Sequence, residues 1–516
     1  MYSPRPWYVL LLLCCVASVP VALAQQPPRP AGEDEVAELR REVAELKAQI
    51  QQLQATQAAQ AKPPAAAAAP APAAAAAQSA ATQASVDKLQ KQVDTLQAKA
   101  SQPPTAGWNG EHFFLRSTDG TFNLMPTGYL TGQYGVYGNT YGAPPDSFSI
   151  SRARIGFEGS YGKQLDFVMN IETISSPTVR DAYLDFKPAS EFRLMAGQMK
   201  VPFSMEVGTA DTAVDFANRS IIGVLYPDAG GSNRAPGIDA HGDFERGAIQ
   251  YWVGVFNGQG ILTSGTTNEA EIVARLTLNP WKNSDIGLLK GFSFGGSYEH
   301  SRSKGLAGEQ SFSGAMNDNT YTFFPQFHIN GNVNRWNVFS SYLDGPLGVR
   351  AEYAHLQQDR DDIGSIATGG IGFLSQPPVV GEGYYVSAIY FLTGESDPLN
   401  ALPRVIHPVI GPASPGESGA PGWGAWAVKV RYSHLSGNAP GSSCDATTLP
   451  ACPITPVIAP GFNDDTDQFS FGVNWYLNYW VLLKTDVNID RLKDPSVQGI
   501  LPRNYTVFFE TLQFRF

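Results

Sequence analysis

The final stretch of the chain, from Asp467 to Phe516, constrains the fold most strongly. Apolar residues alternate with largely polar ones from Gln468 to Leu477, and a second alternating run extends from Val481 to Asp490. The last run ends on Phe516 itself, and only Glu510 interrupts its apolar face. Alternation with a period of two predicts β-strands that have one apolar and one polar face. A terminal phenylalanine on the apolar face suits a strand that closes a barrel inside a membrane.

Composition agrees with a β-barrel. Of the 516 residues, 51 are glycine, 11% are aromatic and only 16% are charged. No internal apolar run approaches the ~20 residues that a membrane-spanning helix requires. Because only helices and closed barrels satisfy every backbone polar group in lipid, a membrane protein with this sequence is expected to be a barrel. An array of soluble β-sandwiches is the alternative.

Residues 1–24 have the pattern of a secretory signal peptide. Arg5 precedes an apolar run, and Ala22-Leu23-Ala24 is a small-x-small cleavage site. The two cysteines outside this segment are Cys444 and Cys452, and they lie in a stretch rich in glycine, serine and proline. In an oxidising compartment this pair predicts a disulfide, and metal binding is the weaker alternative.

Two heptad-like stretches predict a short α-helical coiled coil before the barrel. Apolar residues recur at spacings of three and four from Val36 to Leu53, and again from Val86 to Ala100. An alanine- and proline-rich tract between them predicts a semi-extended spacer. We therefore expect a spacer and coiled coil at 25–60, a linker at 61–85, and a second short coiled coil with its linker at 86–107. For the first stretch, a lone amphipathic helix packed on its own domain is the alternative.

The remainder, 108–516, is expected to be an all-β barrel of about sixteen antiparallel strands, an even number as in single-chain barrels of the outer membrane. The expected strands are Tyr129–Tyr137, Ser149–Tyr161, Leu165–Ile174, Val179–Lys187, Phe192–Lys200, Ile238–Phe244, Gly247–Asn257, Ile272–Asn279, Phe292–Arg302, Trp336–Leu343, Gly348–Gln357, Tyr384–Leu392, Trp423–Leu435, Gln468–Leu477, Val481–Asp490 and Tyr505–Phe516. Short turns alternate with long connections, apart from a proline-rich insert after Leu392. Tyr321–Ile329 could form one more strand and is assigned to a loop.

Charged side chains are predicted to face the barrel lumen. Arg152 and Arg154 share one face of their strand, whereas Ile155 and Phe157 share the other. If the apolar face meets lipid, both arginines point inward. By the same reasoning the lumen also receives Asp166, Asn170, Glu172, Asp181, Tyr183, Asp185, Lys187, Arg350, Glu352, Lys429 and Arg431. Cross-strand pairs that merely brace a polar interior are the alternative for any one of these residues.

Several runs resemble the phosphate-selective porin O and P family. They are Ser151–Gly159, Arg180–Phe186, Gly197–Ser204, Phe216–Ser220, Tyr384–Val386 with Thr393–Glu395, Asn474–Asn478 and Leu512–Phe516. The likeness follows the chain in order over nearly all of the expected barrel. The helical extension lies outside it, although some family members carry one.

The resemblance implies a sixteen-stranded trimeric channel whose third loop folds inward and narrows the pore. In this chain that loop would be Val201–Gly237, with Lys200 at its entrance and Arg219 and Arg234 within it. Phosphate-selective members line the constriction with lysines and the approach with arginines, whose donors replace the hydration shell of the ion. The pore-lining and anion-binding candidates are therefore Arg152, Arg154, Lys200, Arg219, Arg234, Arg350, Lys429 and Arg431. The expected loop departs from this pattern because it has no lysine of its own and contains four acidic residues.

The sequence gives little support to an enzyme or to a nucleic-acid-binding protein. There is no H-E-x-x-H motif, and the seven histidines are scattered, so we expect no enzyme, no cofactor and no metal site. The formal net charge is −11, and residues 25–107 balance eight basic against eight acidic side chains. The acidity therefore belongs to the segment from Trp108 onward, which argues against nucleic acid as a partner.

Together these features predict a passive channel in the bacterial outer membrane. It would pass small anionic or neutral solutes, with phosphate as a candidate, and would assemble as a homotrimer surrounded by outer-membrane lipid. The helical extension would lie in the periplasm and could reach a periplasmic or cell-wall partner. The alternative is a structural protein that tethers the envelope through this coiled coil.

Overall fold

The computed structural model describes residues 45, 47–49, 51–52, 87–94, 105–137, 145–174, 176–227, 233–258, 260–261, 269–303, 330–361, 376–417, 419–439, 462–493 and 504–516. The chain divides into two compact units, and residues 106–116 and 120–516 form the second. In the first unit, residues 87–94 are helical, within the second heptad stretch. The signal peptide, most of the first heptad stretch, Tyr321–Ile329, Cys444 and Cys452 lie outside the described residues. The coiled coil and the disulfide therefore stay predictions.

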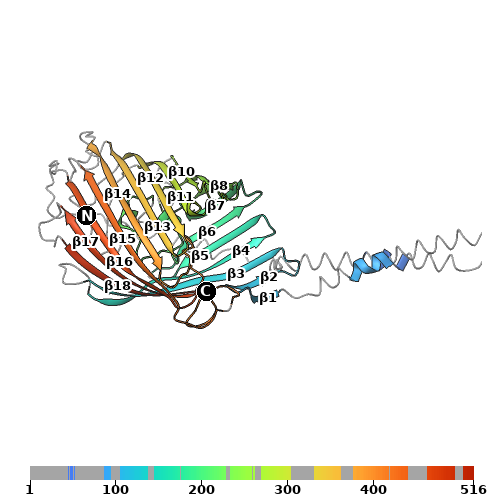
Figure 1. The fold of residues 1–516 in the computed structure, drawn as a ribbon. Coiled ribbons are helices and arrows are strands. Elements are labelled where there is room, and N and C mark those ends of the chain that lie inside the picture. Colours follow the sequence, from blue (N-terminus) through green and yellow to red (C-terminus); the bar gives the residue numbers. More distant parts are fainter. Residues whose placement is uncertain are drawn as a thin grey trace, which may run out of the picture. The chain divides into compact units, whose positions relative to one another are not determined.

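Sixteen antiparallel strands, β3 to β18, close into a barrel when β18 pairs with β3 (Figure 1). Their bounds are β3 Phe122–Val136, β4 Ser147–Tyr161, β5 Leu165–Glu172, β6 Thr178–Phe186, β7 Arg193–Lys200, β8 Arg234–Phe244, β9 Ile249–Phe256, β10 Glu271–Leu278, β11 Phe292–Ser303, β12 Gly331–Asp344, β13 Leu347–Arg360, β14 Gln376–Phe391, β15 Ala425–Ala439, β16 Phe462–Tyr476, β17 Val481–Lys493 and β18 Asn504–Arg515. Two short strands, β1 (Thr105–Trp108) and β2 (Phe113–Arg116), precede them, and β2 pairs with the start of β3.

Each of the sixteen expected strands corresponds to one barrel strand, so the predicted number is confirmed. The expected bounds were less accurate than the number. The start of β8 at Arg234 rather than Ile238 matters most, because it makes the third loop end at Asn233 instead of Gly237. Arg234 is therefore a wall residue, held in register opposite Lys200 of β7.

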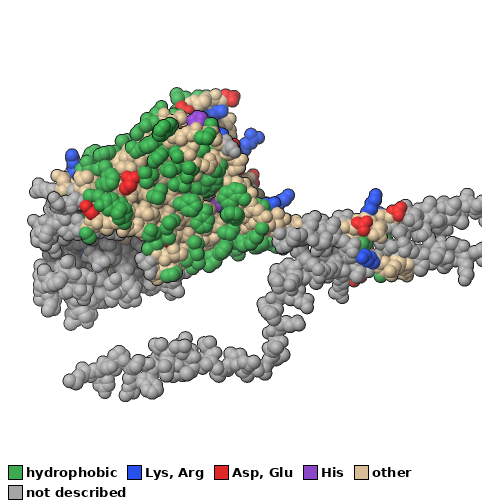
Figure 2. Space-filling view, turned by 90° about the horizontal axis from the view of Figure 1, so that it is seen from below, with side chains coloured by type: hydrophobic (Ala, Val, Ile, Leu, Met, Phe, Trp, Pro, Cys, Tyr) green, Lys and Arg blue, Asp and Glu red, His purple; other side chains and the backbone are tan. Residues whose placement is uncertain are grey.

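The outer surface of the barrel is apolar and the lumen is polar. Outward-facing Ile155, Val430 and Leu512 are each more than half exposed, whereas inward-facing Arg154 and Lys429 are buried. Figure 2 shows hydrophobic side chains spread over the outside of the strands. This arrangement is the one expected when lipid surrounds a barrel whose interior is polar. Within the described parts of the chain, none of the helices combines the length and the apolar character that a membrane crossing needs.

Two β-bulges re-aim side chains in the wall. Between β3 and β4 the register shifts at Ser151, so that Ile150 and Ile155 both lie on the exposed face. Between β5 and β6 it shifts at Arg180, which has no partner of its own in the ladder. A bulge places two residues opposite one and turns the extra side chain away from strict alternation.

The two ends of the barrel differ. At one end the connections are mostly tight, as at Gly345-Pro346 between β12 and β13. The connection between β14 and β15, Leu392–Gly424, lies at this same end and is much longer; we call it the insert. At the other end the connections are long, and the one between β7 and β8, Val201–Asn233, is called loop 3.

Candidate pore constriction

Loop 3 lies inside the barrel and not over its rim. It contains a helical turn, α4 (Met205–Gly208), and a 3₁₀ segment, η1 (Ile221–Leu225). Ile222 and Leu225 of η1 are fully buried in an apolar cluster with residues of β7 to β10, β12 to β15 and β18. Burial of these side chains inside a polar barrel fixes the loop against one part of the wall.

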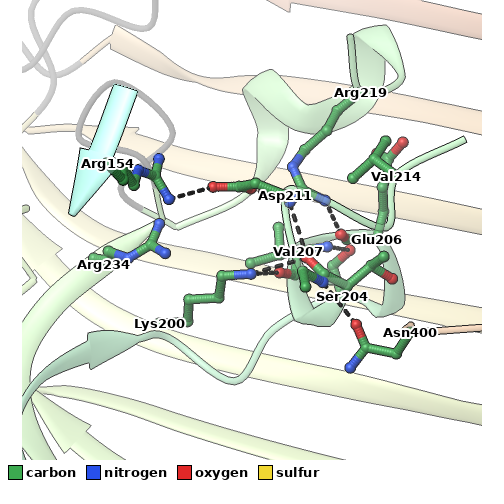
Figure 3. Close-up of polar contacts among 12 residues, drawn as sticks. Arg154, Lys200, Ser204, Glu206, Val207, Asp211, Val214, Arg219, Arg234 and Asn400 are labelled. Carbon is green, nitrogen blue, oxygen red and sulfur yellow. Dashed lines mark hydrogen bonds and ion pairs between the residues drawn. The ribbon is translucent and has the colours of Figure 1, made fainter. Parts of the chain in front are cut away.

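Charged and polar groups anchor the beginning of loop 3. The Ser204 hydroxyl accepts a hydrogen bond of 3.2 Å from the Val207 amide and caps α4. Lys200 Nζ donates to the carbonyl oxygens of Val207 and Thr209, at 3.0 and 2.9 Å (Figure 3). A lysine at the end of a helical turn satisfies carbonyls that have no partner within the helix. Lys200 thus stabilises the loop that it was expected to precede.

Asp211 of loop 3 joins the loop to the wall. Its carboxylate accepts hydrogen bonds from Arg154 NH1 at 2.6 Å and from Arg219 NH2 at 2.7 Å (Figure 3). Burial alone would raise the pKa of Asp211, but Lys200, Arg219 and Arg154 hold that pKa well below its usual value. Asp211 therefore stays ionised and binds Arg154 of the wall and Arg219 of loop 3 together.

Long side chains of the opposite wall donate to loop 3 carbonyl groups. Lys429 of β15 donates to the Asp215 carbonyl at 2.7 Å, and Lys484 of β17 donates to the Val214 carbonyl at 2.6 Å. Arg431 NH1 donates to the Asn218 carbonyl at 3.1 Å. These three cations therefore hold the loop rather than face open space.

A cavity of about 930 Å³ remains on the other side of loop 3. Its wall comes from β3 to β12, with the end of β18. The floor includes Glu111 and His112, which precede β2, together with Leu399 and Asn400 of the insert. The lumen is thus filled on one side and open on the other.

The phosphate-selective porin O and P family model matches residues 128–489, which is most of the barrel. The chain belongs to this family. It is an outer-membrane porin, a channel and not an enzyme. Outer-membrane barrels in general have short turns at the periplasmic end and longer loops on the cell exterior.

Solved structures with a similar fold include other porins. OmpT of Vibrio cholerae shares 11% identity at a TM-score of 0.47, over 77% of this chain and 98% of that chain. An anion-selective porin from Comamonas acidovorans shares 12% at 0.46, over 77% and 100%. The channel DcaP of Acinetobacter baumannii shares 11% at 0.44, over 77% and 97%. No curated protein sequence matches the chain significantly.

Arg234 and Arg350, like Arg154 and Arg219, pair with carboxylates of the porin's own wall, loop 3 or insert. Arg234 Nε lies 2.7 Å from Asp181 on the neighbouring β6. Arg350 of β13 lies between two acidic residues, 2.9 Å from Asp215 of loop 3 and 2.6 Å from Asp397 of the insert. These pairs neutralise much of the positive charge that the resemblance implied, so an anion-binding role for Arg234 and Arg350 stays a prediction.

Arg152 and Arg180 differ from the candidates that pair with carboxylates, such as Arg234 and Arg350. Among the described residues, Arg152 has no ion-pair partner, and the buried Nε of Arg180 has no hydrogen-bond partner. Both side chains lie within electrostatic reach of Asp211. Strict alternation would have put Arg180 on the lipid face, where a charge is costly. A charged residue at a predicted lipid-facing position was the sequence signal for the bulge. The candidates predicted from the sequence did not include Arg180.

The described residues contain neither a nucleophile elbow at the one matching motif nor a metal-binding cluster. Gly291 to Gly295 has the G-x-S-x-G spacing of a nucleophile elbow, but Ser293 lies in β11 and not at a strand-to-helix turn. No group of three histidine, cysteine or acidic side chains that could hold a metal ion occurs in the part of the chain that the structure describes.

Proposed function

We propose that this porin is a passive diffusion channel for small solutes, with a modest preference for anions, phosphate among them. The observation that carries the proposal is the pair of arginines, Arg152 and Arg180, that have no carboxylate partner among the described residues. A guanidinium group without a partner can replace part of the hydration shell of a passing anion, and a single weak contact lets the ion leave again.

The balance of charge around the cavity supports a modest preference. Arg154, Lys200, Arg234, Arg275 and Arg515 line it, against Glu111, Glu158, Asp181, Asp211 and Asp239. Five cations against five carboxylates leave little net field. Arg152 and Arg180 do not line the cavity, but both lie within electrostatic reach of Asp211 and add positive charge near it. An anion could bind the other candidates only through N–H groups that do not already donate to a protein oxygen. These candidates are Arg154, Lys200, Arg219, Arg234, Arg350, Lys429 and Arg431.

Replacing both arginines tests the proposal. The double variant Arg152→Gln with Arg180→Gln should move the reversal potential in a potassium chloride gradient toward that of a cation-selective channel. Arg404→Gln is the control for the loss of one exposed positive charge, because Arg404 is exposed on the insert and pairs there with Glu417. An unchanged reversal potential in a folded double variant would contradict the proposed anion contacts.

We also propose a homotrimer, as the family resemblance implies, with the helical extension in the periplasm. The segment that leads into the barrel supports the second point, because β2 pairs with β3 at the tight-turn end of the strands. The heptad residues favour dimers weakly, so the barrel rather than the helix would set the number of subunits.

Tethering of the envelope is the second candidate, and the predicted coiled coil is the feature that favours it. Deletion of residues 25–100 separates the two roles while keeping β1. Loss of envelope integrity with unchanged conductance would assign a tethering role to the extension. Loss of oligomers in detergent would assign it a role in assembly.

A further inference from the structure

The lumen wall beside the insert is apolar, unlike the rest of the interior. Ile389 and Phe391 of β14, Ala427 of β15 and Leu482 of β17 face inward there and are almost completely buried. A barrel wall that meets water is expected to be polar. Leu402 and Val405 of the insert pack against this apolar patch and explain it. The insert therefore folds back into the periplasmic mouth and fills that side of the lumen.

The insert also reaches loop 3. The Ala210 amide of loop 3 donates a hydrogen bond of 2.6 Å to Asn400 Oδ1 of the insert (Figure 3). Arg350 joins the same two segments from the wall, because one guanidinium group binds Asp215 and Asp397 together. Two segments that enter from opposite ends of the barrel are thus fastened to each other near its middle.

The backbone of the insert is strained at this contact. Leu399 has φ of 49°, in the left-handed region that bulky residues avoid. Such strain persists only where the surroundings determine the conformation, and it marks functional segments more often than passive ones. The strained conformation of the insert places Leu399 and Asn400 at the edge of the open cavity.

The cavity shows which part of the lumen stays open. The residues that line it come from β3 to β12, loop 3, the insert and the two chain segments beside Glu111 and Phe516. No described residue of β13 to β17 lines it. A solute that passes loop 3 must therefore move between the β3 to β12 wall on one side and loop 3 with Asn400 on the other.

We propose that the insert is a second constriction segment, which closes the β13 to β17 side of the periplasmic mouth and places Asn400 in the permeation path. Loop 3 and the insert together form one rim of the narrowest passage, and the wall from β3 to β12 forms the other. The charge at position 400 then helps to set ion selectivity. This inference rests on conduction by the porin, but it does not depend on which ion is preferred.

Charge substitutions at position 400 test whether this residue lies on the permeation path. Asn400→Asp and Asn400→Lys are compared in planar bilayers under a potassium chloride gradient. We expect the anion-to-cation permeability ratio to differ by about threefold or more between them, since a unit charge within several ångströms of an ion changes its energy by about RT even in water. Glu417→Gln changes the net charge as Asn400→Lys does, but on an exposed part of the same insert, and should leave the ratio at the wild-type value.

The outcomes are distinct. Equal permeability ratios for N400D and N400K would overturn the proposal, because they would place position 400 outside the path. Divergent ratios would support it even if the wild-type porin showed no anion preference, in which case only the proposed function would fail. A second variant, with residues 395–422 replaced by two glycines, should conduct more than the wild type; equal conductance in a folded barrel would contradict the proposal.

Discussion

At the scale of single residues, the constriction is organised by ion pairs in which loop 3 supplies the acids. Asp211 binds Arg154 and Arg219, and Asp215 binds Arg350. Removing one partner of a buried pair leaves the other charge unpaired and costs more than the pair itself contributes. The pairs therefore determine the position of the loop more than the total stability of the barrel.

Asp211→Asn should loosen loop 3 strongly. Arg219 and Arg154 both lose the Asp211 carboxylate, although Arg154 keeps Glu172 at 2.9 Å, and the cost should be about 3–5 kcal/mol. We expect larger current fluctuations in single-channel recordings and faster tryptic cleavage at Arg219. Asp166→Asn is the control, because Asp166 and Lys187 form a partly exposed pair that should contribute at most about 1 kcal/mol. Equal resistance to trypsin in D211N and the wild type would refute the anchoring role.

The effect of D211N should not depend on pH across the neutral and mildly acidic range. The lowered pKa of Asp211 keeps its carboxylate charged, so its stabilisation is lost only when the pH falls through that low value. The ratio of D211N to wild-type current fluctuations should therefore be the same at pH 8 and at about pH 5. A ratio that falls toward one by pH 5 would mean that Asp211 titrates near the ordinary value.

At the scale of strands, the seam between β18 and β3 closes the barrel through the last residue. Gly128 and Phe516 exchange two backbone hydrogen bonds of 2.9 Å. The Phe516 ring covers Gly128 so closely that a Cβ at this position would lie 2.5 Å from ring carbon Cζ, and 2.8 Å from the Arg154 carbonyl oxygen. Gly132, four residues further along β3, would meet nothing within 4 Å.

Gly128→Ala should therefore destabilise the barrel, and Gly132→Ala should not. Overpacking of this kind typically costs about 1–3 kcal/mol. Thermal unfolding in detergent, followed by circular dichroism, should show a lower midpoint for the first variant alone. If the two variants unfold at the same temperature, the terminal ring does not hold the seam.

Strands were predictable from the sequence because a period of two, as in Phe469 to Leu477, is a local signal. The route of loop 3 was not, since it depends on distant donors such as Lys429 and Lys484, whose carbonyl partners carry no sequence signal. The folding of the insert into the mouth was also missed. Its signal was present in Phe391 and Leu482, apolar residues on faces that should otherwise meet water.

At the scale of the whole molecule, the barrel contains the complete proposed permeation path. Loop 3, the insert and the lining of the cavity all lie within residues 106–516. Deletion of residues 25–100 should therefore leave single-channel conductance and ion selectivity unchanged. A large change in either, in a folded and inserted barrel, would mean that the extension takes part in permeation.

The proposed channel is a porin whose half-open lumen prefers anions modestly. The most direct test is the reversal potential of the purified wild-type protein in planar bilayers, first under a potassium chloride gradient and then under a potassium phosphate gradient. We expect an anion-selective reversal potential in both salts, without strong block of chloride current by phosphate. Cation selectivity in both would contradict the assigned roles of Arg152 and Arg180, and the absence of any channel would contradict the account as a whole.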